Sequence, residues 1–214
     1  MTIDVKICGI REARHALVAA ESGARWIGFV FFPPSPRNLT IEEARILAPQ
    51  LPEGPKRVGV FVNAPDELLK SAVAALSLDA VQLHGQESPK DAARIKKKLG
   101  VRIIKAMGVS NEEDLKKAEA FAPHVDRILF DAKPPKGAAL PGGNAVSFPW
   151  HILKGKNLPY KWMLAGGLKP ENVTEAITAS DATALDVSSG VETVPGKKSS
   201  DLIKAFLMSV KAAK

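Results

Sequence analysis

The sequence contains a single cysteine, Cys8, so no disulfide bond can form within the chain. Near its N-terminus it also lacks the long apolar run that a signal peptide or a membrane span requires. A chain with neither feature is typical of the reducing cytoplasm. We therefore expect a cytoplasmic protein with no membrane partner.

The spacing of metal ligands is missing as well. The histidines belong to no recognisable ligand motif and are dispersed along the chain, at His15, His84, His124 and His151. No other residue pattern in the sequence implies a bound cofactor. We expect neither a metal site nor a cofactor.

The chain carries 30 basic and 23 acidic residues, which gives a net charge of +7. Such an excess suits either nucleic acid or a small anionic substrate. The densest basic run, Lys96-Lys97-Lys98, lies late in an amphipathic pattern, where cations complement the dipole of a helix end. This position favours a solvated helix end, so we predict a small anionic substrate and no nucleic-acid partner.

Short apolar runs rich in Val, Ile and Phe alternate with helical patterns along all 214 residues. This rhythm predicts βαβ units and a parallel sheet. With 45% hydrophobic residues, the chain can bury one sizeable core, and its length is near the lower limit for a complete eight-unit barrel. We therefore expect one domain over residues 1–214. The predicted strands are Val5–Cys8, Trp26–Phe31, Arg57–Val62, Ala80–His84, Arg102–Met107, Arg127–Asp131, Trp162–Ala165 and Ala184–Val187.

Eight such units can close into a barrel or form an open, doubly wound sheet. An open sheet commonly shows a glycine-rich nucleotide fingerprint after its first strand, and Cys8-Gly9-Ile10-Arg11 stands there instead. We therefore predict the α/β class with a single-domain (β/α)8 TIM barrel.

Three predicted helices carry start signals. Thr40 with Glu43, and Ser110 with Glu113, have the spacing of capping boxes. Ser88-Pro89 has the pattern of an N-cap followed by proline at the first helical position.

The stretch Ala132–Gly143 departs from this rhythm. Proline, glycine and lysine dominate it, and no helical period appears until about Ser147. We interpret it as a long βα loop, and long loops in compact domains are often functional.

Polar residues at alternate positions of a strand mark the side that faces the barrel interior, because the side facing the helices should be apolar. The pairs Lys6 with Cys8, Gln82 with His84, and Asp186 with Ser188 fit this parity, as does Asp131. Most of them fall at the C-terminal ends of strands, where barrel active sites are built.

Cys8 ends the first strand and is followed by the small residue Gly9. A thiol acts as a base when its pKa falls, which a nearby cation such as Lys6 or the environment of the bound substrate could promote. Asp131 ends the sixth strand after the apolar run Ile128–Phe130, and an apolar floor favours a protonated carboxyl group that can donate a proton. The alternatives are an inert buried cysteine and an aspartate that caps a helix.

Two glycine-containing loops follow the last two strands: Gly166-Gly167 after the seventh, and Ser188-Ser189-Gly190 after the eighth. These loops form the phosphate site of many barrels, where backbone N–H groups approach an anion closely. Each motif also suits an ordinary tight turn. Their joint position favours phosphate binding.

Arg37 lies in a proline-stiffened loop, Pro34–Asn38, and can present a guanidinium fork to a substrate carboxylate. The alternative is an ordinary surface arginine. His84 is either a substrate contact or a hydrogen-bonded core histidine.

Taken together, these motifs resemble the phosphoribosylanthranilate isomerases of tryptophan biosynthesis. The resemblance follows the family's order over nearly the whole chain. Its segments are Lys6–Gly9, Gly28–Phe31 with Ser35–Arg37, Val58–Asn63, Val81–Gly85, Phe130-Asp131, Leu164–Leu168 and Leu185–Glu192.

The resemblance implies an Amadori rearrangement of N-(5-phosphoribosyl)anthranilate to 1-(2-carboxyphenylamino)-1-deoxyribulose 5-phosphate. By that likeness Asp131 is the general acid that opens the furanose ring, and Cys8 is the base that takes the C2 proton. Arg37 would hold the anthranilate carboxylate, and the two glycine-containing loops the phosphate. Asp186 would pair with Lys6 or contact a substrate hydroxyl. A monomer or a homodimer is expected.

Two positions depart from the family pattern. Ile10-Arg11 stands where a Thr or Asn usually follows the Cys-Gly pair, and Phe148-Pro149-Trp150 replaces a usual Phe-Asp-Trp. The second is expected to alter only a helix start, since proline is tolerated in the first turn.

Three alternatives stay open. Two are other phosphosugar barrels: the aminoimidazole-carboxamide ribonucleotide isomerase of histidine synthesis, and indole-glycerol-phosphate synthase. The former resembles a barrel with an aspartate base on its first strand, so Cys8 argues against it, although use of both substrates by one enzyme stays open. The third is a non-catalytic phosphate-binding barrel, in which Cys8 and Asp131 need not face one another across the mouth.

Overall fold

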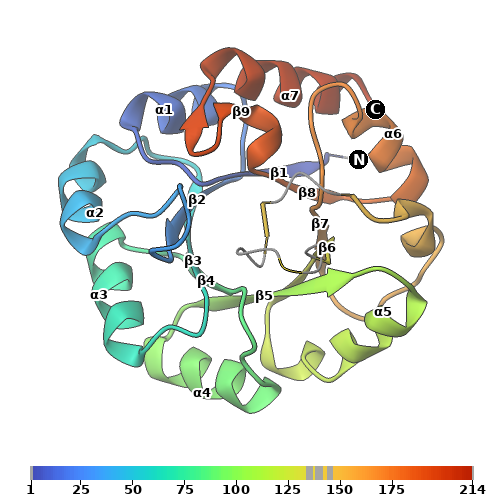
Figure 1. The fold of residues 1–214 in the computed structure, drawn as a ribbon, viewed down its shortest axis with the longest axis horizontal. Helices are drawn as coiled ribbons and strands as arrows, with labels where there is room; N and C mark the ends of the chain where they lie inside the picture. The colour runs from blue at the N-terminus through green and yellow to red at the C-terminus, as the bar shows by residue number, and fades with distance from the viewer. Residues whose placement is uncertain (1, 134–136, 138–141, 144–146, 214) are drawn as a thin grey trace.

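The computed structural model describes residues 2–133, 137, 142–143 and 147–213. Eight parallel strands pair in sequence order, and β1 pairs with β8, so the sheet closes into a barrel with the helices outside it (Figure 1). This confirms the (β/α)8 prediction against an open, doubly wound sheet. The strands are β1 Asp4–Cys8, β2 Trp26–Phe31, β3 Lys56–Phe61, β4 Ala80–Leu83, β5 Arg102–Val109, β6 Arg127–Ala132, β7 Trp162–Leu164 and β8 Ala184–Val187.

The predicted strands lie close to the observed ones. Trp26–Phe31 and Ala184–Val187 match exactly, and the other ends shift by at most two residues. The largest difference is at the end of β5, which continues to Val109 because it pairs with β6 as far as Ala132.

Seven α-helices and four short 3-10 helices lie in the described part of the chain. The α-helices are α1 Ala13–Glu21, α2 Ile41–Leu47, α3 Asp66–Leu76, α4 Pro89–Leu99, α5 Glu112–Glu119, α6 Val173–Ser180 and α7 Ser200–Ala212. The 3-10 helices are η1 Ala48–Gln50, η2 Ala122–His124, η3 Trp150–Leu153 and η4 Ser189–Val191.

Two of the three predicted helix starts are confirmed. Thr40 caps α2 in a complete capping box with Glu43, and Ser88 caps α4 ahead of Pro89. The capping box at Ser110 was wrong. Asn111 is the N-cap of α5, since its side chain accepts a hydrogen bond from the backbone of Asp114.

The lysine run ends α4, as the sequence predicted. Lys96 pairs with Asp126 at 2.9 Å, and Lys98 pairs with Asp66 at 2.6 Å. Two of the three lysines of the run are thus engaged in ion pairs on the outside of the barrel.

The segment between β6 and β7 differs from the other units. Ala132 belongs to β6 and not to the predicted loop, and the described residues that follow contain only the 3-10 helix η3. Residues 134–136 and 138–141 of the predicted loop lie outside the described residues. Pro149 is the N-cap of η3, so the departure from the family pattern at this position coincides with a helix start.

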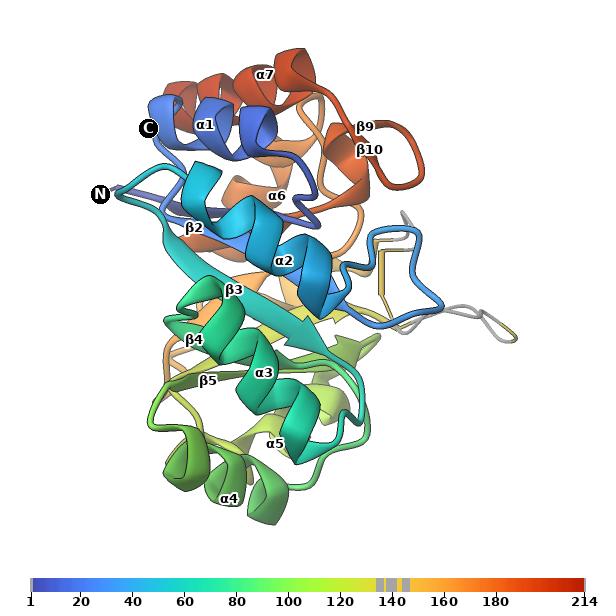
Figure 2. The same cartoon turned by 90° about the vertical axis from the view of Figure 1, so that its left-hand side faces the viewer.

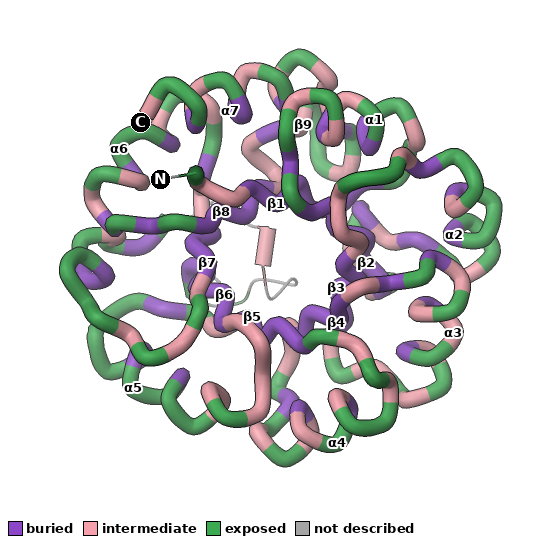
Figure 3. Tube along the Cα trace, turned by 180° about the vertical axis from the view of Figure 1, so that it is seen from behind, coloured by how far each residue is buried: buried purple, intermediate pink, exposed green. Residues whose placement is uncertain are grey.

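Two apolar layers make up the core, one inside the barrel and one between the barrel and the helices. The barrel wall is buried nearly throughout (Figure 3). Inside it, Trp26, Leu129 and Met163 belong to one cluster, whereas Cys8, Val30 and Val60 form another. The interior is therefore packed, and its second cluster contains the predicted base.

Seen from the side, the barrel has two unlike ends (Figure 2). The chain termini lie at one end, and a small antiparallel hairpin, β9 Glu192–Val194 with β10 Lys197–Lys198, lies at the other. This hairpin sits beside the C-terminal ends of the barrel strands. It therefore borders the end where barrel active sites are built.

Candidate active site

A pocket opens at the C-terminal ends of the strands. It encloses about 760 Å³ of space, part of it open to solvent, which suits a small-molecule ligand. The predicted site residues that line it are Cys8, Arg37, His84, Asp131, Gly166, Gly167, Asp186, Ser188 and Ser189.

The Cys8 side of the pocket holds a buried ion pair. Lys6 is fully buried inside the barrel, and its Nζ donates to Oδ1 of Asp186 at 2.9 Å. Gly28, on the neighbouring strand β2, makes room for this side chain: a Cβ there would lie 3.1 Å from Nζ and 2.9 Å from the Cys8 Sγ. The predicted pairing of Lys6 with Asp186 is confirmed.

Charge and burial act against each other on this side. Burial favours a neutral Lys6 amine, but the attraction of Asp186 and of Cys8 outweighs it and holds the pKa of Lys6 above its ordinary value. Burial also raises the pKa of the Cys8 thiol, and the opposing effect of Lys6 does not cancel it. Lys6 thus lowers the pKa of Cys8 as expected, but burial outweighs it and Asp186 adds to the rise, so the pKa of the thiol in the free protein lies above its ordinary value.

The Asp131 side of the pocket is built from a backbone amide and an imidazole. Oδ1 of Asp131 accepts a hydrogen bond from the backbone N–H of Ala132 at 2.8 Å, and Oδ2 lies 3.5 Å from Nε2 of His84. Nδ1 of His84 is 3.1 Å from the amide nitrogen of Gln82. The orientation of the Gln82 amide therefore sets the tautomer of His84. The tautomer in turn decides whether Nε2 carries a hydrogen that it can donate to Asp131.

Gly142 closes over these two side chains. A Cβ at this position would lie 2.8 Å from both Oδ2 of Asp131 and Nε2 of His84. The predicted loop thus supplies at least one described residue to the pocket, at a point where a side chain would displace Asp131 or His84.

The loop after His84 is fixed from outside the barrel. Lys105, buried on β5, donates to the carbonyl of Gly85 at 2.7 Å and to Glu87 at 2.8 Å. Glu87 in turn accepts the backbone N–H of Gly85 at 2.9 Å. This network holds the backbone next to His84 in place.

Arg37 is buried, not a free surface residue as one interpretation allowed. Its Nε and Nη2 donate to the two carboxylate oxygens of Glu192, each at 2.8 Å. One edge of the guanidinium is therefore occupied within the protein, although the side chain still lines the pocket. A substrate carboxylate can meet only the edge that remains.

The two predicted phosphate loops meet on one side of the pocket. Gly166 and Gly167 both have positive φ angles, +88° and +68°, which a side chain would strain. Ser188 and Ser189 line the pocket from the loop directly after β8. Gly190 is not among the lining residues; it allows the β8 loop to pack against the backbone of Leu168 in the β7 loop.

Apolar side chains form the remaining wall. Val30 and Phe32 come from the end of β2, and Val60 and Val62 come from the end of β3. This wall adjoins Arg37, so the pocket combines an apolar face with a cation at its edge. Such a face suits an aromatic ring that carries an anionic group.

Sequence comparisons point to one family. Residues 5–209 match the family model described as N-(5'-phosphoribosyl)anthranilate (PRA) isomerase. A relative of that name from Paramagnetospirillum magneticum is 49% identical over 214 residues and covers 100% of both chains. Another from Paracoccus denitrificans is 47% identical, covering 97% of this chain and 96% of the relative.

The chain belongs to the phosphoribosylanthranilate isomerase family. The resemblance found in the sequence is thereby confirmed. Membership of this enzyme family sets aside the two other phosphosugar barrels and the non-catalytic barrel.

Solved structures of phosphoribosylanthranilate isomerases have the same fold. The Thermotoga maritima protein matches with a TM-score of 0.87 and 40% identity, covering 99% of this chain and 100% of that one. A second structure, with a TM-score of 0.85 and 39% identity over the same shares, is a complex with reduced 1-(o-carboxyphenylamino)-1-deoxyribulose 5-phosphate.

Within the described ranges, no helix is long and apolar enough to cross a membrane. The same ranges contain no group of three or more His, Cys, Asp or Glu side chains placed to hold a metal ion.

The main residues that sequence reasoning missed are Glu192 and Lys198. Glu192 stands at the end of a segment that resembles the phosphoribosylanthranilate isomerases, but nothing in its spacing linked it to Arg37. Hydrogen bonds from Arg37 and the charge of Lys198 hold the pKa of Glu192 below its ordinary value, although burial opposes them. Burial lowers the pKa of Lys198, against the attraction of Glu192.

Proposed function

We propose that Cys8 and Asp131 are the base and the acid of the Amadori rearrangement that defines this isomerase family. The observation that carries the proposal is that both side chains line one pocket, from the ends of β1 and β6. A substrate held between them would meet one proton acceptor and one proton donor. The reaction requires only proton transfers, which suits this pair.

The first step is ring opening. Asp131 donates its proton to the furanose ring oxygen of N-(5-phosphoribosyl)anthranilate, the bond from that oxygen to C1 breaks, and the anilino nitrogen forms a Schiff base. Asp131 is left as a carboxylate. The nearby backbone N–H of Ala132, which donates to Oδ1, stabilises this charge.

The second step is proton abstraction. The Cys8 thiolate takes the proton from C2, and the electron pair moves through C1 to the nitrogen, which gives an enolamine. Tautomerisation then yields 1-(2-carboxyphenylamino)-1-deoxyribulose 5-phosphate. Cys8 must lose its own proton before this step, so burial of the thiol makes the reaction pH-dependent.

Substrate recognition follows from the rest of the pocket. The loops Gly166-Gly167 and Ser188-Ser189 offer small residues to the phosphate, with Gly190 supporting their close approach. Arg37 offers the edge that does not contact Glu192 to the anthranilate carboxylate. Asp186 and His84 line the same pocket, and we infer that they contact sugar hydroxyls of the substrate.

The experiment that tests the proposal is turnover of N-(5-phosphoribosyl)anthranilate by the purified protein, followed by the loss of the substrate's fluorescence. Turnover that disappears in Cys8→Ala and Asp131→Asn, with substrate binding retained, supports it. Turnover that survives in both variants would show that other groups carry the protons.

We also infer the cellular form of the protein. Residues 1–214 act as a single domain in the cytoplasm, as a monomer or a homodimer, on a small phosphorylated substrate and without nucleic acid or membrane. A solved structure of monomers of the dimeric Thermotoga maritima isomerase, with a TM-score of 0.84 and 39% identity, supports the choice of these two states. Light scattering of the purified protein distinguishes them.

A further inference from the structure

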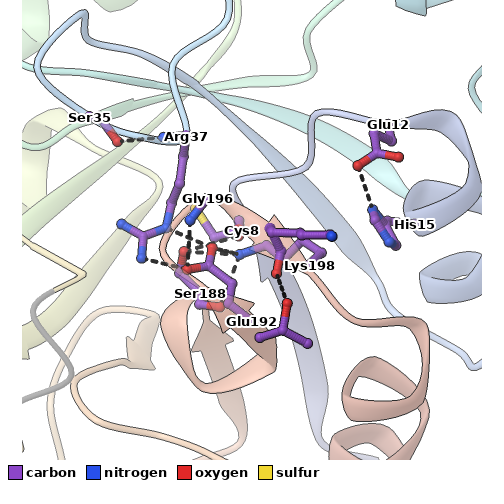
Figure 4. A network of polar contacts seen from close by, with 11 residues as sticks. Cys8, Glu12, His15, Ser35, Arg37, Ser188, Glu192, Gly196 and Lys198 are labelled. Atoms are coloured by element: carbon purple, nitrogen blue, oxygen red, sulfur yellow. Dashed lines mark hydrogen bonds and ion pairs between the residues drawn. The ribbon is translucent and has the colours of Figure 1, made fainter.

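A buried charge cluster connects the β2 loop to the β9–β10 hairpin (Figure 4). Arg37 donates two hydrogen bonds of 2.8 Å to Glu192, and Lys198 donates one of 2.6 Å to the same carboxylate. The side chains of Arg37, Glu192 and Lys198 are only 6%, 3% and 1% exposed. Buried charges with several short contacts have little freedom to move, so this cluster fixes the guanidinium.

Only one member of the cluster reaches the pocket. Arg37 is among the lining residues, whereas Glu192 and Lys198 are not. Glu192 binds the Nε and Nη2 edge of the guanidinium, which leaves Nη1 as the nitrogen without a contact to Glu192. A Cβ at Gly143, a residue of the pocket wall, would lie 2.7 Å from Nη1, so this nitrogen points to the pocket side.

The hairpin is built so that Glu192 has a defined position. The backbone N–H of Gly196, in the turn, donates to Oε2 of Glu192 at 3.1 Å. Gly196 has a φ of +85° and lies against the Pro36 carbonyl, next to Arg37 in the chain. Lys198 also donates to the Ser188 carbonyl at 2.9 Å, which anchors the hairpin to the β8 loop.

We propose that Glu192 is the positioning residue that aims Arg37, and so sets the preference of the site for a carboxylated aromatic amine. Glu192 does not touch the substrate; it holds one edge of the guanidinium so that the other edge faces the ring's carboxylate. The inference rests on the proposed role of Arg37 in binding that carboxylate. It adds the residue, Glu192, that holds Arg37 in the orientation this contact requires.

Charge and position lead to opposite expectations for one substitution. Glu192→Gln removes a negative charge next to Arg37, so if charge alone mattered, an anionic ring substituent would bind more tightly. If Glu192 acts by aiming the guanidinium, the same change loosens Arg37, and the carboxylate binds less well although the site has become more positive.

The test compares two ligands by calorimetry. One is reduced 1-(o-carboxyphenylamino)-1-deoxyribulose 5-phosphate, and the other is the same compound without the carboxyl group. The dissociation constant of the compound without the carboxyl group, divided by that of the carboxylated compound, measures the preference for the carboxylate. This ratio cancels effects on phosphate and sugar binding. We expect this ratio to fall about tenfold in Glu192→Gln, since a hydrogen bond between charged groups is typically of that strength.

Two further variants complete the design. Glu192→Asp keeps the charge and shortens the side chain, so it tests position at constant charge; it should also lower the ratio, and it serves if the Gln variant does not fold. Asp79→Asn is the matched control, because Asp79 likewise accepts from a lysine Nζ and a backbone N–H, but precedes β4 at the opposite end of the barrel. It should leave the ratio unchanged.

The outcomes separate this inference from the proposed function. A ratio that falls in Arg37→Ala but stays at the parent value, or rises, in both Glu192 variants overturns the positioning role and leaves Arg37 as the carboxylate contact. A ratio that does not fall in Arg37→Ala shows instead that the proposed role of Arg37 is wrong. In steady-state kinetics, the positioning role predicts a raised KM in Glu192→Gln with a smaller change in kcat.

Discussion

The two sides of the pocket place charge in different ways. On the Cys8 side, Lys6 and Asp186 form an ion pair inside the barrel, and the base is buried next to it. On the Asp131 side, the contacts come from a backbone N–H and from His84, which is itself in contact with an amide. The base thus has a lysine and an aspartate as neighbours on barrel strands, whereas the acid contacts a backbone N–H and an imidazole next to a glycine-containing loop.

This difference fits the two tasks. A thiol gains from a nearby cation, because the cation stabilises the thiolate that must form. A carboxyl group that has to donate a proton gains from neighbours without a full positive charge, since a cation would stabilise its ionised form. Substitutions on the two sides should therefore have different signatures.

The largest effect is expected for Cys8→Ala on the base side. Alanine offers no group that takes the C2 proton, so kcat should fall by about 10²–10⁴-fold, the range for loss of a general base. The cavity left by the change is small, so thermal unfolding should stay close to that of the parent. Turnover near the parent rate in a folded variant would leave Cys8 as a core residue only.

Asp131→Asn, on the acid side, should have a somewhat smaller effect. The amide keeps the shape of the carboxyl group and can still donate a hydrogen bond to the ring oxygen, but it cannot transfer a proton. We expect a loss of roughly 10²–10³-fold in kcat with little change in KM, the signature of an interaction made chiefly in the transition state. A near-parent kcat would exclude Asp131 and turn attention to Asp186 or His84.

Arg37→Ala belongs to neither side and should act on binding. Loss of a hydrogen bond between charged groups is expected to cost about 1.5–3 kcal/mol of binding free energy for the carboxylated substrate. Arg37→Lys should restore only part of it, because an ammonium group does not reproduce the planar fork. Calorimetry with a carboxylate-free analogue is the control: a comparable loss for this analogue would contradict the assignment.

The residues on both sides could be predicted from the sequence because they follow a local rule. Period-two alternation along a strand, together with the strand's C-terminal end, is enough to place Cys8 and Asp131 at the mouth of a parallel barrel. Strand bounds were predicted well for the same reason, since each strand is a short apolar run. The family resemblance then supplied the roles.

What the sequence could not provide depends on contacts between distant segments. The pairing of Arg37 with Glu192 spans 155 residues and requires the β9–β10 hairpin to fold back over the β2 loop. The direction of the Cys8 pKa depends on a balance between burial and the charge of Lys6, which only the packed barrel sets. The helix start at Ser110 was wrong for a local reason, because the adjacent Asn111 is an equally good cap.

The smallest expected effect concerns the pH dependence of the base. Burial raises the pKa of Cys8 and Lys6 lowers it, while Asp186 raises it by a lesser amount.

Replacing the pair by neutral residues, Lys6→Met with Asp186→Asn, should therefore raise the pKa of Cys8 further. The double change avoids the unpaired buried charge that either single change would leave. We expect the thiolate fraction at neutral pH to fall, because Lys6 lowers the pKa of Cys8 more than Asp186 raises it. Because Asp186 lines the pocket, turnover is an unsuitable measure, and the rate of alkylation of the free enzyme by iodoacetamide should be followed against pH instead. The sign also follows for stability: a thiol whose pKa is raised in the folded state contributes stability below its unfolded pKa and loses it as pH rises through the folded value. Because the double variant lacks the Lys6 charge that stabilises the thiolate, its midpoint of alkylation should move to higher pH. A shift to lower pH would show that Lys6 does not stabilise the Cys8 thiolate.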